Sequence, residues 1–388
     1  MKRLLAAALL LAACTQKPAM TPEISEKIAG LHSPDARVRG AAAYGLARMG
    51  PRALPAAPDL VALLADDLQL VREPEGVQTT ASSEADSALR AIGDERLDAA
   101  MLIDALKRLP WNGRDNVAEH LKYSVDPRAI PAMIDAILTP GEELLVPTPE
   151  PAAAARASIA DALGVAAEIA RKHGTKVITD PRLLVALKNE NLSIRRSAAR
   201  ALYAVGDANA IEPLLAFAND RSAEREMRIA TTFALGGIRD ARVVPPLIAL
   251  VSDSDAAVRS AAIRGLGERR DRRAVPALTT ALKDSDPASR SNAVAALAST
   301  GGASTVPALL ALFNEQDFGL RDGAVRALGE LRDERATDPL IALLERETSD
   351  NVRHDIGTAL LQITHEDRGT DAAAWRRWRT RKSWEFWK

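Results

Sequence analysis

The chain has 388 residues, of which 47% are hydrophobic but only 3% are aromatic. Large single cores bury many aromatic side chains, so this Ala- and Leu-rich composition disfavours one such core and favours thin layers of stacked helices. The 51 Lys and Arg residues nearly balance 52 Asp and Glu residues, giving a net charge of −1 and no overall attraction for nucleic acid.

Residues 1–13 have the parts of a secretory signal peptide. Lys2 and Arg3 form a basic start, and the apolar run at residues 4–13 is about half of the ~20 residues that a membrane-spanning helix needs. The following Leu11-Ala-Ala-Cys14 resembles the bacterial lipobox, which implies cleavage before Cys14 and lipid attachment to its thiol and new N-terminus. Cys14 is the only cysteine, so no intramolecular disulfide can form.

The lipoprotein resemblance implies a location as well as a modification. Two or more acyl chains hold a protein stably at a membrane, so the body would sit in the aqueous part of the bacterial cell envelope. Thr15 is not Asp, and in enteric lipoproteins this favours the outer membrane, facing the periplasm. Residues 14–24 would be the lipidated cysteine and a polar tether. The alternative is an ordinary signal peptide that an unrelated cysteine happens to follow.

Residues 25–191 predict irregular helical pairs. The proposed pairs are 33–67, 85–93 with 95–109, 114–124 with 127–138, and 152–173 with 181–189. Insertions at 71–84 and 140–151 interrupt them.

Residues 192–365 contain a regular repeat. An arginine preceded by an apolar or small residue recurs at intervals of 33, 31, 31, 31 and 32 residues: Arg195, Arg228, Arg259, Arg290, Arg321 and Arg353. Each opens a helical phrase that ends near Ala-Leu or Leu-Gly, and a second phrase with an early proline follows in most copies, as at Pro276 and Pro307. Proline is tolerated in the first turn of a helix, so each unit predicts helix, tight turn, helix.

Glycine and aspartate mark the predicted helix ends. We expect the glycines between the two phrases, including Gly265 and Gly267, to form turns at the C-terminus of the first helix. Asp255 and Asp286 precede first helices and predict N-caps, with Pro287 at the first helical position.

This pattern resembles the HEAT repeat, in particular the short HEAT-like repeats named after phycobilisome lyases. The resemblance is clear over 192–365 and visible again at 33–67. It implies an all-α fold, an α/α solenoid of about ten helical hairpins forming a curved superhelix, with an extended concave surface suited to a protein partner. Many non-enzymatic proteins share this repeat, so the name alone does not imply lyase activity.

The recurring arginines have two interpretations. A row of guanidinium groups could bind an anionic ligand. We favour a structural ladder, in which each arginine pairs with carboxylates at the preceding repeat boundary, because a single copy at a fixed register in each repeat suits a packing role.

The sequence offers no catalytic constellation. The histidines lie in different repeats without metal-ligand spacing and predict surface or loop positions: His32, His120, His173, His354 and His365. We therefore expect no enzyme activity, no metal and no cofactor.

The C-terminal segment, residues 366–388, is rich in Trp and Arg. Trp375 and Trp378 are spaced as neighbours on one helix face and predict a cap over the last repeat. A cap over the last repeat does not require Trp384 and Trp387 as well. They could lie at a membrane interface, anchor a partner, or belong to a terminus without function.

Together these features predict a non-catalytic, lipid-anchored envelope scaffold or adaptor that binds an unidentified protein partner, contacts the membrane through its lipid, and does not bind nucleic acid. The alternatives are a lyase-like accessory or maturation factor, and an envelope structural protein that binds glycan or lipid through its C-terminal aromatic residues.

Overall fold

A computed structural model describes residues 18–66, 69–72, 77–139 and 150–385. The predicted signal peptide and Cys14 lie outside the described residues, as do most of the second insertion and Trp387. The chain forms two compact units, Met1–Val205 and Gly206–Lys388, and each is described by itself.

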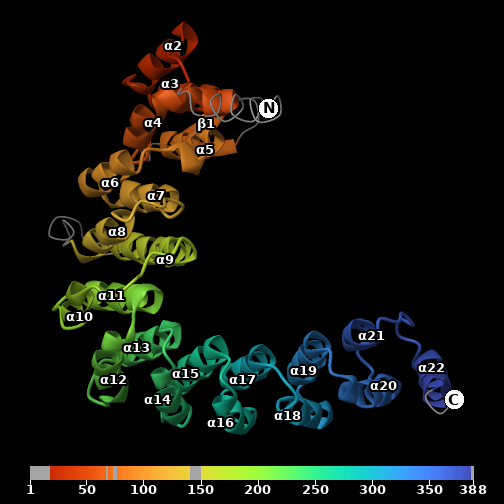
Figure 1. The fold of residues 1–388 in the computed structure, drawn as a ribbon. Helices are drawn as coiled ribbons and strands as arrows, with labels where there is room; N and C mark the ends of the chain where they lie inside the picture. Colours follow the sequence, from red (N-terminus) through yellow and green to blue (C-terminus); the bar gives the residue numbers. More distant parts are fainter. Residues whose placement is uncertain (1–17, 67–68, 73–76, 140–149, 386–388) are drawn as a thin grey trace, which may run out of the picture. The chain divides into compact units, whose positions relative to one another are not determined.

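Unit 1 (Met1–Val205) consists of two alternating rows of helices (Figure 1). The A row contains α3 (Ala36–Met49), α5 (Ala81–Ile92), α7 (Trp111–Leu121), α9 (Glu150–Lys172) and α11 (Leu192–Val205). The B row contains α2 (Pro22–Leu31), α4 (Ala57–Leu63), α6 (Ala99–Arg108), α8 (Ala129–Leu138) and α10 (Pro181–Ala186), with 3-10 turns η1 (Gly50–Ala56) and η2 (Asp94–Arg96). A helices pack on A helices and on their B neighbours, as a solenoid requires.

Unit 2 (Gly206–Lys388) repeats this arrangement more regularly. Its A row contains α13 (Arg225–Gly237), α15 (Ala256–Arg269), α17 (Pro287–Thr300), α19 (Phe318–Leu331) and α21 (Asp350–Thr364). Its B row contains α12 (Ile211–Asn219), α14 (Val244–Leu250), α16 (Val275–Ala281), α18 (Val306–Ala311) and α20 (Thr337–Arg346), and α22 (Ala372–Glu385) follows. Short 3-10 turns lie beside the B helices: η3 (Ala208–Ala210), η4 (Ala241–Val243), η5 (Arg272–Ala274), η6 (Leu312–Asn314) and η7 (Glu334–Ala336).

The core of unit 2 is a line of small apolar layers. The leucine at the same register of each A helix is fully buried: Leu235, Leu266, Leu297, Leu328 and Leu360. Burying a leucine stabilises the folded state by about 2 kcal/mol relative to leaving it exposed, so each layer contributes to the stack. Asp255 and Asp286 cap α15 and α17, and Pro287 is the first residue of α17, as the sequence predicted.

Several glycines of the repeat lie in contacts between helices and not in the predicted turns. Gly265 and Gly267 lie inside α15 and are buried, so the prediction that they form turns is wrong. A Cβ atom on Gly236 would lie 2.6 Å from the Cα of Gly265, and one on Gly267 would lie 3.0 Å from the Cα of Ala296. These glycines therefore allow neighbouring A helices to approach closely. Gly301, with φ +69°, does cap α17.

The only strands among the described residues lie at the first insertion, and the first of them begins two residues before the predicted start at Val71. The strands β1 (Gln69–Arg72) and β2 (Val77–Thr80) pair antiparallel, with Gln69 opposite Thr80. The helix α5 then begins at Ala81, within the predicted insertion, because Thr80 and Ser83 form a capping box.

The helix α2 lies before the first predicted helical pair at 33–67 and was not predicted. Thr21 caps it by accepting a hydrogen bond from the Ile24 amide at 3.3 Å, and Pro22 is its first residue. The last residues of the predicted tether at 14–24 are therefore helical. In the part of the chain that the structure describes, no helix has the length and apolar character needed to cross a membrane.

Candidate binding surface

Each arginine of the ladder in the middle of unit 2 connects two repeat boundaries. The Nη1 of Arg259 donates to the carbonyl oxygens of Asp253 and Ser254 at 2.9 and 3.3 Å, at the boundary before α15. Its Nε and Nη2 donate to the carboxylate of Asp284 at 2.7 and 2.6 Å, at the boundary after α16. A single guanidinium therefore joins two successive hairpins.

The same pairing recurs along unit 2. The carboxylate partners are Asp253 for Arg228 at 2.5 Å, Asp317 for Arg290 at 3.4 Å, and Glu347 for Arg321 at 3.1 Å. The prediction that these carboxylates come from the preceding boundary is wrong. The preceding boundary supplies carbonyl oxygens, and its carboxylates accept from backbone N–H groups of their own turn and helix, as Asp255 does from Ala257.

Burial and two short hydrogen bonds distinguish the Arg259–Asp284 pair from ordinary surface ion pairs. The side chains of Arg259 and Asp284 are 13% and 9% exposed. Their hydrogen bond is the main cause that raises the pKa of Arg259 and lowers the pKa of Asp284. Both groups therefore stay charged through the neutral pH range.

Outside the centre of unit 2, the recurring arginines vary in their hydrogen-bond and ion-pair partners. In unit 1, Arg195 donates to the carbonyls of Asn189 and Glu190 at 2.7 and 2.9 Å. Arg39, which the predicted set omitted, pairs with Asp66 at 2.5 Å and repeats the pattern. At the other end, Arg353 donates only to carbonyls, and no carboxylate among the described residues pairs with it.

The helix α22 covers the end of unit 2. Trp375 is fully buried, and its Nε1 donates to the Gly369 carbonyl at 3.0 Å. The ring of Trp378 meets it edge to face, with centroids 5.6 Å apart. Arg376 and Arg379 hold α22 to α20, through Glu345 at 2.6 Å and Asp338 at 2.8 Å. This geometry suits the predicted cap, while the side chains of Trp384 and Trp387 lie outside the described residues.

Two open pockets on the described part of unit 2 bear on its binding surface. One, of about 480 Å³, lies between α20, α21 and α22 and is lined by Leu344, Glu345, Arg353, Ala372, Ala373, Arg376 and Arg377. The other, of about 860 Å³, is a groove between α14 and α16 whose lining includes Ile248, Val251, Ala277, Thr280 and Lys283.

His120 of unit 1 was predicted at the surface or in a loop, and that prediction is wrong. It is 1% exposed on α7, with Nδ1 2.6 Å from Asp94 and Nε2 3.1 Å from Asp86. Burial opposes the charged imidazole, but the two carboxylates outweigh it and raise the pKa of His120. The available sequence signal was its place beside Val117 and Leu121 on the apolar stripe of the helix.

Arg156 of α9 is a second buried group that the repeat pattern did not reveal. It is fully buried and donates to the Thr139 carbonyl at 3.1 Å and to the Ser193 hydroxyl at 3.3 Å. Its guanidinium carbon lies 4.6 Å from the ring centroid of Trp111, and Arg114 lies at the same distance. Cation–π contacts of this kind stabilise the junction beside the second insertion.

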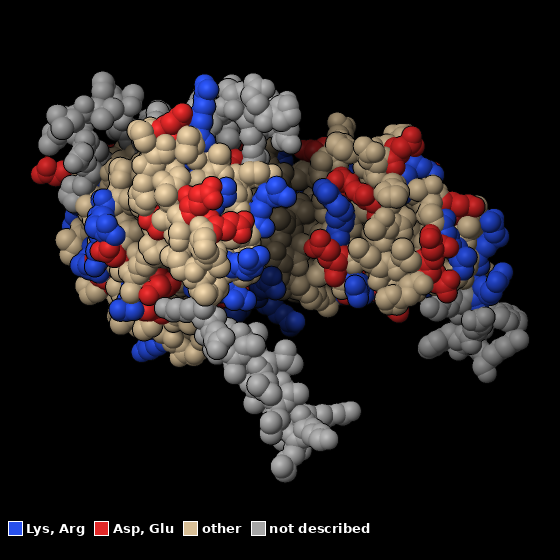
Figure 2. Space-filling view, turned by 90° about the horizontal axis from the view of Figure 1, so that it is seen from above, with Lys and Arg blue, Asp and Glu red and all other residues tan. Residues whose placement is uncertain are grey.

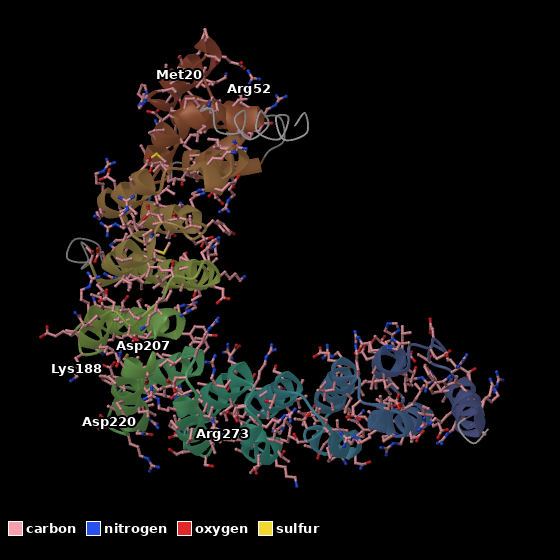
Figure 3. All side chains as sticks on the ribbon, in the orientation of Figure 1. Met20, Arg52, Lys188, Asp207, Asp220 and Arg273 are labelled. Carbon is pink, nitrogen blue, oxygen red and sulfur yellow. The ribbon has the colours of Figure 1, made fainter. Side chains whose placement is uncertain are left out.

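Charges of both signs are interspersed on the face shown in Figure 2. Local ion pairs also lie beside the B helices, such as Arg273 with Asp271 at 2.7 Å, at the N-terminal end of α16 (Arg273 is labelled in Figure 3). Residues 18–66, 69–72, 77–139 and 150–385 contain no group of three or more His, Cys, Asp or Glu residues placed to hold a metal ion.

Comparison with known proteins agrees with this geometry. The HEAT repeats family matches residues 220–289 and 275–361, and the PBS lyase HEAT-like repeat matches residues 194–220. A search of curated proteins finds no match.

Similar solved structures share low identity with the chain. A crystal structure of an engineered protein is 20% identical, with 88% of this chain and 99% of that chain covered and a TM-score of 0.36. Human deoxyhypusine hydroxylase in complex with glycerol is 18% identical, with 71% and 95% covered and a TM-score of 0.30. Kap95p, in a structure with RanGDP, is 14% identical, with 88% and 51% covered and a TM-score of 0.49. The family matches and the stacked hairpins together identify an α/α solenoid with HEAT repeats over residues 194–361.

Proposed function

We propose that this chain is a non-catalytic scaffold of the bacterial cell envelope, held at the membrane by lipid on Cys14, that binds a protein partner along its B helices. The observation that carries the proposal is the composition of one surface of unit 2. We define the B face as these exposed residues of the helices α14, α16 and α18: Pro245, Ala249, Pro276, Thr280, Pro307 and Ala311.

The helices α14, α16 and α18 contain no charged residue, whereas charged residues lie in the turns beside them. Arg242 pairs with Asp240, and Arg273 pairs with Asp271, at the N-terminal ends of α14 and α16. Protein interfaces are depleted of charge at their centres and polar at their rims, and the B face has this arrangement. The groove of about 860 Å³ between α14 and α16 offers room for side chains of a partner.

The pairing of the buried charged side chains in unit 2 supports a scaffold rather than a catalyst. The buried guanidinium and carboxylate groups of unit 2 bind one another or backbone carbonyls, as Arg259 and Asp284 do. Groups that hold hairpins together in this way stabilise a surface, and a surface is what a scaffold requires.

Site-specific photo-crosslinking tests the partner face. A photoreactive residue at Ala249, Thr280 or Ala311 is expected to capture one and the same protein in the native host. The matched controls are Ser291 and Ser299, which are exposed on the A helix α17. Capture from the α17 positions but not from the B helices would reject the proposed face.

The anchor is tested separately. Cys14→Ser is expected to abolish labelling by radioactive palmitate and to release the protein from the membrane fraction, because acyl chains supply the membrane affinity. Unchanged labelling and retention in this variant would contradict lipid attachment at Cys14.

A further inference from the structure

We propose that the pocket between α20, α21 and α22 binds a carboxylate of an acidic segment of a partner protein, with Arg353 as the receiving guanidinium. This inference rests on the proposed function, because it assigns a second contact and a chemical class to the partner. It concerns the end of unit 2, away from the residues that define the B face.

The ladder gives the first argument. Arg228, Arg259, Arg290 and Arg321 each pair with an Asp or Glu from the next repeat boundary. Arg353 is at the equivalent position of the last A helix. The segment that follows α21 offers it the Thr370 carbonyl at 3.0 Å instead of a carboxylate.

Arg353 is therefore hydrogen-bonded but not neutralised. Its Nη1 donates to the carbonyls of Leu344 and Glu347 at 2.8 and 3.2 Å, which fixes the plane of the guanidinium. Fixed guanidinium groups lose little freedom when they bind a carboxylate, so the group is prepared for an external partner.

The pocket around Arg353 has an excess of positive charge. Its volume is about 480 Å³, and Arg353, Arg376 and Arg377 line it against a single carboxylate, Glu345. Arg376 binds Glu345 through two hydrogen bonds of 2.6 and 2.8 Å. Arg377 is 69% exposed, with a 3.8 Å contact to Asp371 as its ion pair. One ordered and one adjustable guanidinium therefore remain for an incoming anion.

The repeat itself indicates which anion fits. At Arg259 and Arg321 the same guanidinium position receives both oxygens of a planar carboxylate through Nε and Nη2. A partner that supplies an Asp or Glu side chain at Arg353 would extend this series by one member. We therefore assign the pocket to a protein carboxylate and treat phosphate as a competing outcome of the test.

Fluorescence anisotropy with the full chain tests this assignment. The probe is a fluorescein-labelled hexaglutamate peptide, and hexaglutamine is the uncharged control. Arg377→Gln is expected to weaken hexaglutamate binding about tenfold, the loss of one charge-assisted hydrogen bond. Arg381→Gln is the matched control, because it removes the same charge from an exposed site on α22 that does not line the pocket, and binding should change less than twofold.

A second variant does not depend on removing an arginine from the fold. Ala373 is exposed and lines the pocket, so Ala373→Glu would place an internal carboxylate there. It is expected to abolish hexaglutamate binding while the thermal unfolding temperature stays the same or rises. Unchanged binding in this folded variant would overturn the proposal.

Two further outcomes also overturn it. Equal weakening by Arg377→Gln and Arg381→Gln would indicate general charge attraction, and displacement of the probe by inorganic phosphate as readily as by glutarate would assign the pocket to phosphate. Failure here with continued crosslinking from the B face would reject the pocket and leave the scaffold function intact.

Discussion

Enclosed charged groups are the residue-scale features that most distinguish this chain from a plain stack of apolar helices. His120 is one of them, since it lies against Asp94 of η2 and against Asp86 of α5, which also pairs with Arg90 of α5. Burial raises the pKa of Asp86, but the ion-pair contact with His120 and the hydrogen bond from Arg90 outweigh burial and lower it. The cluster is therefore most stable with His120 protonated and Asp86 ionised.

This cluster predicts a pH dependence of unfolding. The pKa of His120 is raised in the folded state, so its contribution is complete below the unfolded value of about 6.5 and is lost as pH rises through the folded pKa. Chemical denaturation at pH 6 and pH 8.5 should show that His120→Gln lowers the free energy of unfolding more at pH 6. An equal loss at both pH values would contradict a charged imidazole.

Arg259 gives a second residue-scale prediction. Arg259→Ala leaves the carboxylate of Asp284 buried and removes hydrogen bonds to two carbonyls, so unfolding should become easier by about 3 kcal/mol. The control is Arg242→Ala, whose pair with Asp240 is exposed and should matter little. Urea denaturation of both variants measures the difference, and equal losses would argue against a structural ladder.

The sequence predicted which arginines recur, but not where their partners lie. Periodicity locates Arg259 on the first turn of a helix, and this part of the prediction needs only local spacing. The choice between Asp253, Asp255 and Asp284 depends on how one hairpin is displaced along the next, which spacing within a repeat does not encode. His120 escaped notice for the same reason, because its two aspartates come from a different hairpin.

At the scale of helices, glycine determines how closely neighbours approach. A Cβ on Gly265 would lie 2.9 Å from the Cα of Gly236, so Gly265→Ala must push α13 and α15 apart. We expect a loss of about 1–3 kcal/mol in the free energy of unfolding. Gly164→Ala is the control, because its Cβ would meet only the Cβ of Ala204 at 3.7 Å, and it should stabilise α9 by about 0.5–1 kcal/mol. A stabilising Gly265→Ala would contradict the close approach.

Helix ends give the complementary prediction. Arg270 and Arg332 end α15 and α19 with φ near +50°, a conformation that costs a side-chain-bearing residue about 1 kcal/mol. Arg270→Gly should therefore raise the midpoint of thermal unfolding. Glu268→Gly, two residues earlier and inside the helix, should lower it by weakening helix propensity. Calorimetry that finds the same sign for both variants would contradict this account of the helix end.

The same contrast explains why element boundaries were harder to predict than the elements themselves. A glycine near the end of the first phrase can end a helix, as Gly301 does four residues after Leu297, or sit inside a contact between helices, as Gly267 does directly after Leu266. The contact of Gly267 with Ala296 depends on where the next A helix lies, which the sequence around Gly267 does not give. The hairpin of β1 and β2 was likewise hidden, because its polar residues read as an insertion between helices.

For the molecule as a whole, the decisive property is that contacts join helices close in sequence. In unit 2, α15 packs on α13 and α17, and α19 packs on α17 and α21, so a disturbance at one hairpin has few routes to distant ones. The stability of such a stack is the sum of the intrinsic stability of each repeat and the energy of each interface between adjacent repeats. Hydrogen exchange measured by mass spectrometry can show how the free energy of local opening varies from helix to helix.

Gly265→Ala and His120→Gln test this at two hairpins distant in sequence. Gly265→Ala should speed exchange in α13, α15 and α17 and leave α5 and α7 unchanged, while His120→Gln should speed exchange in α5 and α7 and leave α15 and α17 unchanged. Each variant is the other's control, since both are folded chains with one weakened contact. Faster exchange throughout the chain in either variant would mean that the repeats unfold as one cooperative body, which contacts limited to neighbouring helices do not predict.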